Sequence, residues 1–459
     1  MRKPGFFIPK NYSSAVEFNN VHPKYTKFIA GGTDLIPHWR EKGLPDRLQY
    51  VIDISHLRKK TETVSVNTGT VSVEGNTIHS ILARDHYLRK EATILSQAAE
   101  SIGSLQTRNR GTIGGNIVNA SPAGDLLAPL IILDASLHLH SERGERVVEI
   151  TDFLRGPGRV DLYEGEIIKK ITWPKLLPGV QSLYLKLGRR NALSIARIGV
   201  GLALRIDTKG RVDFCRVALS ATFPVAKRLP RVEEYLYGKV IDGEILKHTA
   251  SLMERELKDI MGNRPSAKYK VPVAGNLVSM ALNKLLHNRN NCCQSSIQKA
   301  KAPLPLNKSQ EEVLVEPNEK MLLKCIVNKQ PFTMLVNPNE RLIDVLRQEL
   351  WLNSCKEGCG IGECGSCTII LDGRTVNACL VLAGQVHGST IVTPEGLNED
   401  PLYNKLQDAF LKQEAVQCGY CTPGMLISCY DLLMHCKNPT PDEVRAAISG
   451  NLCRCGSYQ

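Results

Sequence analysis

The sequence predicts an α+β protein of several domains, and three observations lead to this fold class. The chain of 459 residues is long enough for about three domains at roughly 150 residues each. Residues 1 to about 285 read as short strands, Gly-rich turns and helices in alternation. Of fifteen cysteines, nine fall between Cys355 and Cys436 and two more stand at Cys453 and Cys455.

Composition and charge exclude several classes of protein. A hydrophobic share of 42% with 23% charged residues is that of a globular chain, not of a disordered or fibrous one. The net charge is +12, yet acidic residues interleave with the basic ones, so we expect no nucleic-acid binding. The N-terminal apolar run is too short for a signal peptide, and no run approaches the roughly 20 apolar residues of a membrane span. We therefore expect a cytoplasmic protein, where clustered thiols bind metal more often than they pair.

Two Gly-Gly segments stand out in the first part of the chain: AGGTDL at 30–35 and TIGGN at 112–116. Neither has the G-x-G-x-x-G pattern of a dinucleotide-binding fingerprint, and each alone is typical of a turn. As a pair, they suggest two loops whose backbone N–H groups, with the hydroxyls of Thr33 and Thr112, hold a pyrophosphate. The segment NASPAGD, which ends at Asp125, adds polar side chains suited to a ribityl chain.

The stretch 286–320 is polar, contains scattered proline and has no sustained period, which indicates a linker. It contains Cys292 and Cys293, which we expect to be thiols without a function. After it, Leu323, Cys325 and Val327 alternate as in a strand, and residues 332–336 form a second strand. The simplest interpretation is a hairpin.

A helix is expected next, because Leu342, Leu346 and Leu350 recur every four residues and form one apolar face. Further helices are expected in the last sixty residues. There, residues 440–443 have the sequence of a capping box with Pro at the first helical position.

The first cysteine set has the spacing C-x4-C-x2-C, which is the plant-type [2Fe-2S] pattern, at Cys359, Cys364 and Cys367. Surrounding glycines allow the unusual backbone angles that direct N–H groups at sulfur. A hairpin turn at 372–373 would carry Cys379 back to the loop as the fourth ligand. Zinc ribbons favour paired C-x2-C knuckles, so zinc is the weaker alternative.

The second set is Cys418-x2-Cys421 followed by Cys453-x-Cys455, and by itself it leaves zinc and iron-sulfur open. Both halves lie at expected helix ends, where unpaired N–H groups favour an anionic cluster. Two tetrads imply two one-electron carriers. The remaining thiol near the loop, Cys355, is expected not to be a ligand.

With these residues in place, CKEGCGIGECGSC, NACL, QCGYCTPG and GNLCRCGSYQ resemble the iron-sulfur subunit of molybdenum hydroxylases, the xanthine dehydrogenase family. The resemblance covers residues 321–459. It implies a ferredoxin-like β-grasp [2Fe-2S] domain at 321–395 and an all-α [2Fe-2S] bundle at 396–459. Gln417 is similar to the glutamine that hydrogen-bonds the molybdopterin of the partner.

The segments FIAGGTDL, RNRGTIGGNIVNASPAGDLLAPL and YLKLGRRNALSIA resemble the FAD subunit of the same family. The resemblance implies an FAD-binding domain of the CO dehydrogenase and xanthine dehydrogenase type at 1–175. It also implies that family's α+β C-terminal flavoprotein domain at 176–285. Carried over by position, the FAD contacts are Phe28, Ile29, Ala30, Gly31, Gly32, Thr33, Asp34, Leu35, Thr112, Ile113, Gly114, Gly115, Asn116, Asp125, Ile168 and Lys186.

Because these segments and the linker use the whole length, no room remains for a molybdopterin domain, and we expect no substrate-oxidising residue here. The resemblance implies a hetero-oligomer in which a molybdopterin-binding large subunit oxidises a purine or another N-heterocycle. Electrons would pass through two [2Fe-2S] clusters to FAD and then to NAD+. Alternatives are the same role in a carbon monoxide dehydrogenase-type or aldehyde-oxidising enzyme, or a stand-alone flavin and iron-sulfur NAD(P)H reductase.

Overall fold

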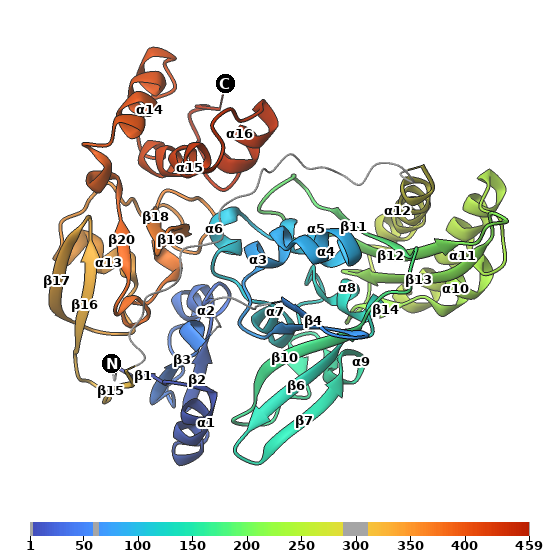
Figure 1. Ribbon diagram of the computed structural model, residues 1–459, viewed down its shortest axis with the longest axis horizontal. Helices are drawn as coiled ribbons and strands as arrows, with labels where there is room; N and C mark the ends of the chain where they lie inside the picture. The colour runs from blue at the N-terminus through green and yellow to red at the C-terminus, as the bar shows by residue number, and fades with distance from the viewer. Residues whose placement is uncertain (1–2, 58–63, 288–310, 459) are drawn as a thin grey trace. The chain divides into compact units, whose positions relative to one another are not determined.

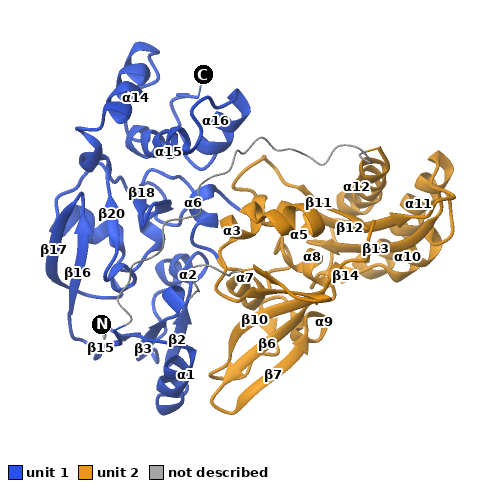
Figure 2. Cartoon of the chain, in the orientation of Figure 1, with its two compact units in different colours: residues 1–61, 103–111, 295–459 blue, residues 62–102, 112–294 orange. Residues whose placement is uncertain are grey.

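The computed structural model describes residues 3–57, 64–287 and 311–458. Two compact units share the chain. Unit 1 comprises residues 1–61, 103–111 and 295–459, and unit 2 comprises residues 62–102 and 112–294 (Figure 2). Each unit therefore gathers segments that lie far apart in the sequence. Cys292 and Cys293 lie outside the described residues.

Unit 1 contains a four-stranded sheet in the order β15-β1-β3-β2 (Figure 1). Its strands are β1 (Gly5–Ile8), β2 (Thr26–Ile29), β3 (Tyr50–Asp53) and β15 (Val313–Val315), and helices α1 (Tyr12–Val21) and α2 (Leu35–Lys42) connect the first three. β3 pairs in parallel with β1 and β2, whereas β15 pairs antiparallel with β1 and places Val315 opposite Phe6. The range 286–320, predicted as a linker, thus includes a strand of this sheet.

The second sheet of unit 1 has five strands in the order β17-β16-β20-β18-β19. Its strands are β16 (Met321–Val327), β17 (Gln330–Val336), β18 (Thr368–Leu371), β19 (Arg374–Asn377) and β20 (Thr390–Val392). The predicted β16–β17 hairpin is confirmed, and buried and exposed side chains alternate along β16 as its sequence indicated. Between β18 and β19, Asp372 and Gly373 both have positive φ, as a two-residue hairpin turn requires.

The predicted helix from 342 to 350 is only partly regular. It begins as α13 (Leu342–Asp344) and continues as a π-helical segment, η2 (Val345–Glu349). Leu342, Val345 and Leu346 are all buried against the second sheet's core, so the expected apolar face is correct.

The C-terminal helices of unit 1 are α14 (Pro401–Lys412), α15 (Thr422–His435) and α16 (Pro441–Ile448). The capping box is confirmed, since Thr440 accepts a hydrogen bond from the N–H of Glu443 while the Glu443 carboxylate accepts from the N–H of Thr440. Shorter helical turns of unit 1 are η1 (Ser55–Leu57), α6 (Leu105–Arg108), η3 (Ala378–Leu380), η4 (Ala383–Val386) and η5 (Pro394–Leu397).

Unit 2 contains a five-stranded sheet in the order β4-β5-β10-β6-β7. Its strands are β4 (Val64–Val66), β5 (Thr70–Glu74), β6 (Ser136–Ser141), β7 (Gly144–Glu149) and β10 (Ile167–Pro174). The helices beside it are α3 (His79–Arg84), α4 (His86–Glu91), α5 (Thr93–Glu100), α7 (Ile113–Asn119), α8 (Leu127–Ile132) and α9 (Ile150–Phe153). Fully buried Ile113, Ile117 and Phe153 belong to the core that joins the sheet to these helices.

The rest of unit 2 is an antiparallel sheet in the order β11-β12-β13-β14 with helices. Its elements are β11 (Gln181–Leu187), β12 (Ile198–Ile206), β13 (Val212–Ser220), β14 (Lys227–Arg228), α10 (Pro230–Leu236), α11 (Gly243–Met261) and α12 (Ala267–His287), and a small sheet pairs β8 (Leu154–Gly156) with β9 (Arg159–Val160). Met253, Val278 and Leu282 from the two long helices are fully buried in one core with β12 and β13. Within the described ranges, no helix combines the length and apolar character that crossing a bilayer requires.

Candidate functional site

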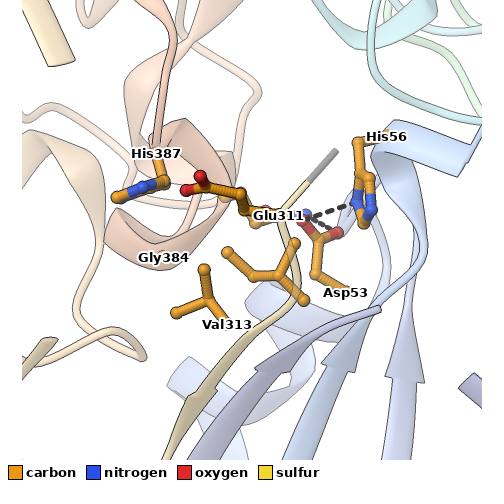
Figure 3. Close-up of a pocket in the computed structure, with 8 residues that line it drawn as sticks. Asp53, His56, Glu311, Val313, Gly384 and His387 are labelled. Atoms are coloured by element: carbon orange, nitrogen blue, oxygen red, sulfur yellow. Dashed lines mark hydrogen bonds and ion pairs between the residues drawn. The ribbon is translucent and has the colours of Figure 1, made fainter. Parts of the chain in front are cut away.

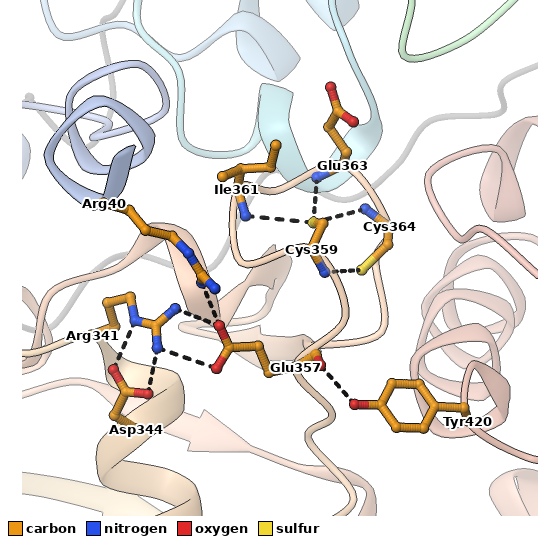
Figure 4. A network of polar contacts seen from close by, with 9 residues as sticks. All are labelled: Arg40, Arg341, Asp344, Glu357, Cys359, Ile361, Glu363, Cys364 and Tyr420. Atoms are coloured by element: carbon orange, nitrogen blue, oxygen red, sulfur yellow. Dashed lines mark hydrogen bonds and ion pairs between the residues drawn. The ribbon is translucent and has the colours of Figure 1, made fainter. Parts of the chain in front are cut away.

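The first cysteine loop directs backbone N–H groups at sulfur. The N–H groups of Ile361, Glu363 and Cys364 all point at Cys359 Sγ, at 3.4, 3.2 and 3.3 Å (Figure 4). In return, the Cys359 N–H lies 3.3 Å from Cys364 Sγ. Donors that converge on a sulfur atom stabilise its thiolate form, which is the form that binds iron.

Glycine is required in this loop for two separate reasons. Gly360, Gly362 and Gly365 have φ values of 67°, 79° and 68°, in the left-handed region that other residues adopt only at a cost. A Cβ at Gly358 would lie 2.7 Å from Cys364 Sγ, inside van der Waals contact. The predicted role of these glycines is therefore borne out by the backbone.

The sulfur atoms of the first set gather in two pairs. Cys359 and Cys364 share one side-chain hydrogen bond, which raises the pKa of Cys359 and lowers that of Cys364. Cys367 and Cys379 share another, and both are buried. The hairpin of β18 and β19 brings Cys379 back to the loop as its sequence predicted.

The second set is also arranged as two pairs, Cys418 with Cys455 and Cys421 with Cys453. Burial opposes ionisation of Cys453, but hydrogen bonds with the hydroxyl and N–H of Ser457 lower its pKa to about 6. Cys421 precedes helix α15, and Cys453 follows shortly after α16, so both halves lie at helix ends.

The number of cysteines in these pairs suits [2Fe-2S] clusters. A [2Fe-2S] cluster needs four thiolates in total, and two of them bind each iron. Each set provides two pairs, which is the number of ligands that one such cluster requires.

Cys355 lies outside both pairs of the first set. It is fully buried, its Sγ lies 3.6 Å from the carbonyl oxygen of Cys367, and burial raises its pKa. Cys355 takes part in neither sulfur pair of the first set, and its assignment as a thiol that binds no iron stays a prediction.

A charged network holds the start of the cysteine loop (Figure 4). Arg341 binds Asp344 at 2.6 Å and Glu357 at 2.7 Å, and Arg40 from α2 also pairs with Glu357. The hydrogen bond from Arg341, followed by that from Arg40, lowers the pKa of Glu357 to about 2. Two residues after Glu357 comes Cys359, so both guanidinium groups fix the loop that carries this sulfur.

A buried polar cluster connects the two cysteine sets. Asn451 is 1% exposed, and its Nδ2 donates to the carbonyl oxygen of Gly365 at 3.0 Å. Its Oδ1 accepts from the Ser428 hydroxyl at 2.7 Å and from Gln106 Nε2 at 3.3 Å. The side chain therefore joins the first cysteine loop, helix α15 and helix α6 at a single point.

The first Gly-Gly loop, in unit 1, follows β2 and leads into α2. The carbonyl oxygens of Ala30, Gly31 and Gly32 accept hydrogen bonds from Gln385, Arg110 and Ile36, at 3.1, 3.4 and 3.0 Å. Among the described residues, the N–H groups of Gly31, Gly32 and Thr33 meet no acceptor. Free N–H groups at a helix N-terminus fit the phosphate of a dinucleotide.

The expected FAD contacts on either side of this loop lie at the end of strand β2 and at the start of helix α2. Phe28 and Ile29 end strand β2, and Ile29 is buried in the core of the first sheet. Asp34 is the N-cap residue of α2, and Leu35 is the first residue of that helix.

Arg110 and Gln385 support the first loop and were not identified from the sequence. Arg110 Nη2 donates to Gln385 Oε1 at 3.0 Å, and Gln385 Nε2 also donates to Asp53 Oδ1 at 3.1 Å. The pKa of Arg110 is lowered by burial, which the charge of Asp53 partly offsets. Since 275 residues separate the two, no local pattern could reveal this contact.

The second Gly-Gly loop, in unit 2, differs from the expectation. The N–H groups of Ile113 and Gly114 donate to Thr77 and Gly75 carbonyls, and those of Gly115 and Asn116 donate to Thr112. The protein itself thus uses the backbone donors that we expected to hold a pyrophosphate. What remains is Asn116 Oδ1, which is buried without a partner among the described residues. An unsatisfied buried oxygen fits a ligand that donates a hydrogen bond there.

The other carried-over positions of unit 2 also lie in well-defined contacts. Lys186 Nζ pairs with Asp125 Oδ2 at 2.8 Å, and Tyr184 donates to Asp125 Oδ1 at 2.8 Å. Burial raises the pKa of Asp125, and the charge of Lys186 opposes this effect. Ile168, buried in β10, lies against Gly75, the glycine whose carbonyl accepts from the second loop.

Two further features of unit 1 are Gln417 and a small pocket. Gln417 immediately precedes Cys418 and is exposed. A small pocket is lined by Asp53 and His56 on one side and by Gly384 and His387 on the other (Figure 3). His56 Nε2 lies 2.6 Å from the carbonyl oxygen of Pro9, so this ring nitrogen is already hydrogen-bonded within the protein.

Comparison with known families matches three models to the chain. Residues 2–176 match the FAD binding domain in molybdopterin dehydrogenase, and residues 183–285 match the CO dehydrogenase flavoprotein C-terminal domain. Residues 393–459 match the [2Fe-2S] binding domain. The chain is 48% identical over 139 residues to the nicotinate dehydrogenase small FeS subunit of Eubacterium barkeri, covering 30% of this chain and 88% of that protein.

The FAD part is similar to a second subunit from the same organism. The chain is 30% identical over 272 residues to the nicotinate dehydrogenase FAD-subunit of Eubacterium barkeri, covering 58% of this chain and 90% of that protein. The chain belongs to the molybdenum hydroxylase family. It is an oxidoreductase subunit that combines the FAD-binding and [2Fe-2S]-binding parts of a molybdenum hydroxylase in one polypeptide.

A solved structure agrees with this assignment. Carbon monoxide dehydrogenase from Hydrogenophaga pseudoflava matches with a TM-score of 0.56 and 28% identity, covering 61% of this chain and 96% of that one. The predicted fold class, a CO dehydrogenase-type flavoprotein joined to [2Fe-2S] domains, is confirmed. In these molybdenum hydroxylases, FAD and [2Fe-2S] belong to the parts present here, and molybdopterin belongs to the partner chain.

The polar cluster generates a stability prediction. Replacing Asn451 by leucine keeps the volume but removes the hydrogen bonds to the Gly365 carbonyl, the Ser428 hydroxyl and Gln106 Nε2. We expect a loss of about 0.5–1.5 kcal/mol for each hydrogen bond removed, because these groups keep other partners. Thermal unfolding followed by the visible absorbance of the clusters should show a lower midpoint. Asn438→Leu, at an exposed asparagine of the same helical region, is the control. Equal midpoints for both variants would contradict the role of Asn451.

Proposed function

We propose that this chain is the electron-transfer subunit of a hetero-oligomeric molybdenum hydroxylase in the cytoplasm. A molybdopterin-binding large subunit oxidises a purine or another N-heterocycle, and this chain carries the electrons to FAD and then to NAD+. The observation that carries the proposal is the pairing of sulfurs in two separate sets, which suits two one-electron carriers beside a flavin. The nicotinate dehydrogenase relatives of both parts support an N-heterocycle as substrate.

The eight cysteines are proposed as iron ligands in two tetrads. Cys359, Cys364, Cys367 and Cys379 form the first, and Cys418, Cys421, Cys453 and Cys455 form the second. The N–H groups around Cys359 compensate negative charge on the first tetrad, and the ion pairs of Arg40 and Arg341 with Glu357 hold the start of this loop in place. Exposed Gln417, beside Cys418, is proposed to hydrogen-bond the partner's molybdopterin.

FAD is proposed to contact each carried-over segment. Bound FAD accepts two electrons and passes them on as a hydride. The free N–H groups of Gly31, Gly32 and Thr33 are suited to its phosphates. In unit 2, Asn116 Oδ1 is suited to accept a hydrogen bond, and the Asp125–Lys186 pair holds polar groups at fixed positions. The full proposed set is Phe28 to Leu35, Thr112 to Asn116, Asp125, Ile168 and Lys186.

Two other functions use the same modules. A carbon monoxide dehydrogenase-type or aldehyde-oxidising enzyme would differ only in its catalytic partner. The similarity to the carbon monoxide dehydrogenase of Hydrogenophaga pseudoflava favours the first of these two over a stand-alone reductase. A stand-alone NAD(P)H reductase needs no partner and has no use for a second tetrad next to an exposed glutamine.

Purification from the native host tests the proposed function. A tagged chain should copurify with a molybdenum-containing large subunit and hold about four iron atoms, as two [2Fe-2S] clusters, and one FAD. Electron paramagnetic resonance should show two distinct [2Fe-2S] signals. Nicotinate or hypoxanthine should bleach the visible spectrum, and NAD+ should restore it. Bleaching by carbon monoxide or an aldehyde alone would identify the alternative enzymes. Purification of the chain without a partner, or with one cluster signal, would refute the proposal.

Substitution in the first Gly-Gly loop tests flavin binding. Gly32 has a φ of 75°, and a Cβ there would lie 2.7 Å from Ile36 Cδ1. Gly32→Ala should therefore move the free N–H groups and reduce the FAD content per chain, with the iron content unchanged. Gly43→Ala is a matched control, because Gly43 ends the same helix with a φ of 79° and no atom within 4 Å. An unchanged FAD content in Gly32→Ala would count against this loop as a flavin contact.

A further inference from the structure

Three successive peptide groups of the first Gly-Gly loop are held at one end and free at the other. The carbonyl oxygens of Ala30, Gly31 and Gly32 each accept a hydrogen bond. In the part of the chain that the structure describes, the N–H groups of Gly31, Gly32 and Thr33 meet no acceptor. These N–H groups belong to the same three peptide groups as the held oxygens. Because the C=O and N–H of a trans peptide point in opposite directions, holding each oxygen fixes the direction of the free N–H across from it.

Distant side chains hold two of these three peptide groups. A backbone N–H of helix α2 donates to the Gly32 carbonyl at 3.0 Å, so that contact is local. Arg110 Nε donates to the Gly31 carbonyl at 3.4 Å, from 79 residues away. Gln385 Nε2 donates to the Ala30 carbonyl at 3.1 Å, from 355 residues away. The direction of two free N–H groups therefore depends on Arg110 and Gln385.

The buried carboxamide of Gln385 fits its surroundings in only one orientation. Its Nε2 donates to the Ala30 carbonyl and to Asp53 Oδ1, both at 3.1 Å. Its Oε1 accepts from Arg110 Nη2 at 3.0 Å and from the Leu382 N–H at 3.2 Å. Turning the amide over would place its NH2 against two donors and its oxygen against a carbonyl and a carboxylate. The side chain is 1% exposed, so water does not compete for these contacts.

Arg110 also brings a positive charge to the loop. The backbone of Gly31 lies against it, since a Cβ at Gly31 would be 2.3 Å from the Arg110 carbonyl oxygen. The guanidinium group keeps its charge in proteins, and its Nε contacts the peptide group that presents the Gly32 N–H. Free N–H groups beside a cation are surroundings that suit a phosphate group.

We propose that Gln385 and Arg110 are positioning residues for the pyrophosphate of FAD. They act through the loop, because the oxygens they hold direct the N–H groups of Gly31 and Gly32 at the phosphates. The proposal rests on the proposed function, which assigns FAD to this loop. Gln385 lies in η4, between strands β19 and β20 of the iron-sulfur part. The flavin site is therefore completed by a side chain of the ferredoxin-like domain.

An isosteric substitution tests this role. Gln385→Glu keeps the acceptor for Arg110 but puts an oxygen in place of the donor to the Ala30 carbonyl. The complete enzyme is stripped of FAD, and the binding of FAD and of ADP, which carries a pyrophosphate without a flavin, is titrated. Both should bind roughly tenfold more weakly in Gln385→Glu, because a misdirected N–H loses its hydrogen bond to a charged group. The iron content and both [2Fe-2S] signals should be unchanged.

Asn339→Asp is the matched control. Asn339 also lies in the iron-sulfur part, and its Nδ2 donates to the Pro4 carbonyl, just before β1, at 2.7 Å. The substitution makes the same chemical change at a contact between the same two parts of unit 1, but not at the loop. Its affinities for FAD and ADP should match those of the wild-type protein.

Three outcomes would overturn the proposal and leave the proposed function standing. These are wild-type affinities in Gln385→Glu, an equal loss in Asn339→Asp, and a loss of FAD affinity without a loss of ADP affinity. If the wild-type protein stripped of FAD binds neither FAD nor ADP, the proposed function is refuted instead.

A second variant separates the lost donor from the added charge. Gln385→Met removes the same hydrogen bond but stays neutral, so it should weaken both ligands by a similar factor. It also replaces Gln385→Glu if that variant does not fold. Arg110→Lys keeps the charge but loses the Nε donor to the Gly31 carbonyl, and it should weaken ADP binding severalfold. Wild-type ADP affinity in Gln385→Met would overturn the role of Gln385, and in Arg110→Lys that of Arg110.

Discussion

Three backbone N–H groups that converge on Cys359 Sγ impose the constraint on which the iron-sulfur part of this molecule depends. A thiolate removed from water needs donors, and a loop can direct several of its own N–H groups at one atom only with unusual backbone angles. Gly360, Gly362 and Gly365 supply these angles. Because the glycines of this loop have no side chain, neighbouring segments can contact its backbone directly at those positions.

Neighbouring segments supply hydrogen-bond donors for the carbonyl groups of the loop. Its carbonyl groups, turned away from sulfur, need donors of their own, and Leu452 and Asn451 provide them for Cys364 and Gly365. On another side of the loop, the negative charge of the Glu357 carboxylate is likewise compensated by neighbours, the guanidinium groups of Arg40 and Arg341. Sulfur binding and domain contact are therefore consequences of one backbone conformation.

The sequence predicts the parts of this architecture that depend on neighbouring residues. The cysteine spacing, the β16–β17 hairpin, the turn at Asp372–Gly373 and the capping box at Thr440 each follow from a short pattern, and the structure contains all of them. The sequence does not predict the π-helical segment after Asp344, because a single π-helical turn is too short for its wider period to show in the spacing of the apolar residues.

Contacts between distant residues were beyond prediction from one sequence. Gln106 and Asn451 are 345 residues apart, and although Asn451 lies in the segment GNLCRCGSYQ, no local pattern identifies Gln106 as its partner. In the second Gly-Gly loop the error was of another kind. The N–H groups of Ile113 and Gly114 look available in the sequence because their acceptors, the carbonyls of Thr77 and Gly75, lie in a separate segment. The pattern indicated the conformation of that loop correctly but could not reveal which groups its donors bind.

Strand β15 has a consequence for how the two halves of the molecule are joined. It follows the flavin-binding part in the chain, yet it pairs with β1, the first strand of that part. If the iron-sulfur half were a separate polypeptide, this pairing would be an intermolecular sheet edge whose occupancy depends on the concentration of both subunits. Covalent fusion replaces that concentration by the much higher effective concentration of a tethered segment. Equal stoichiometry of flavin and iron-sulfur parts is thereby built into a single translation product, without any need to balance the synthesis of two.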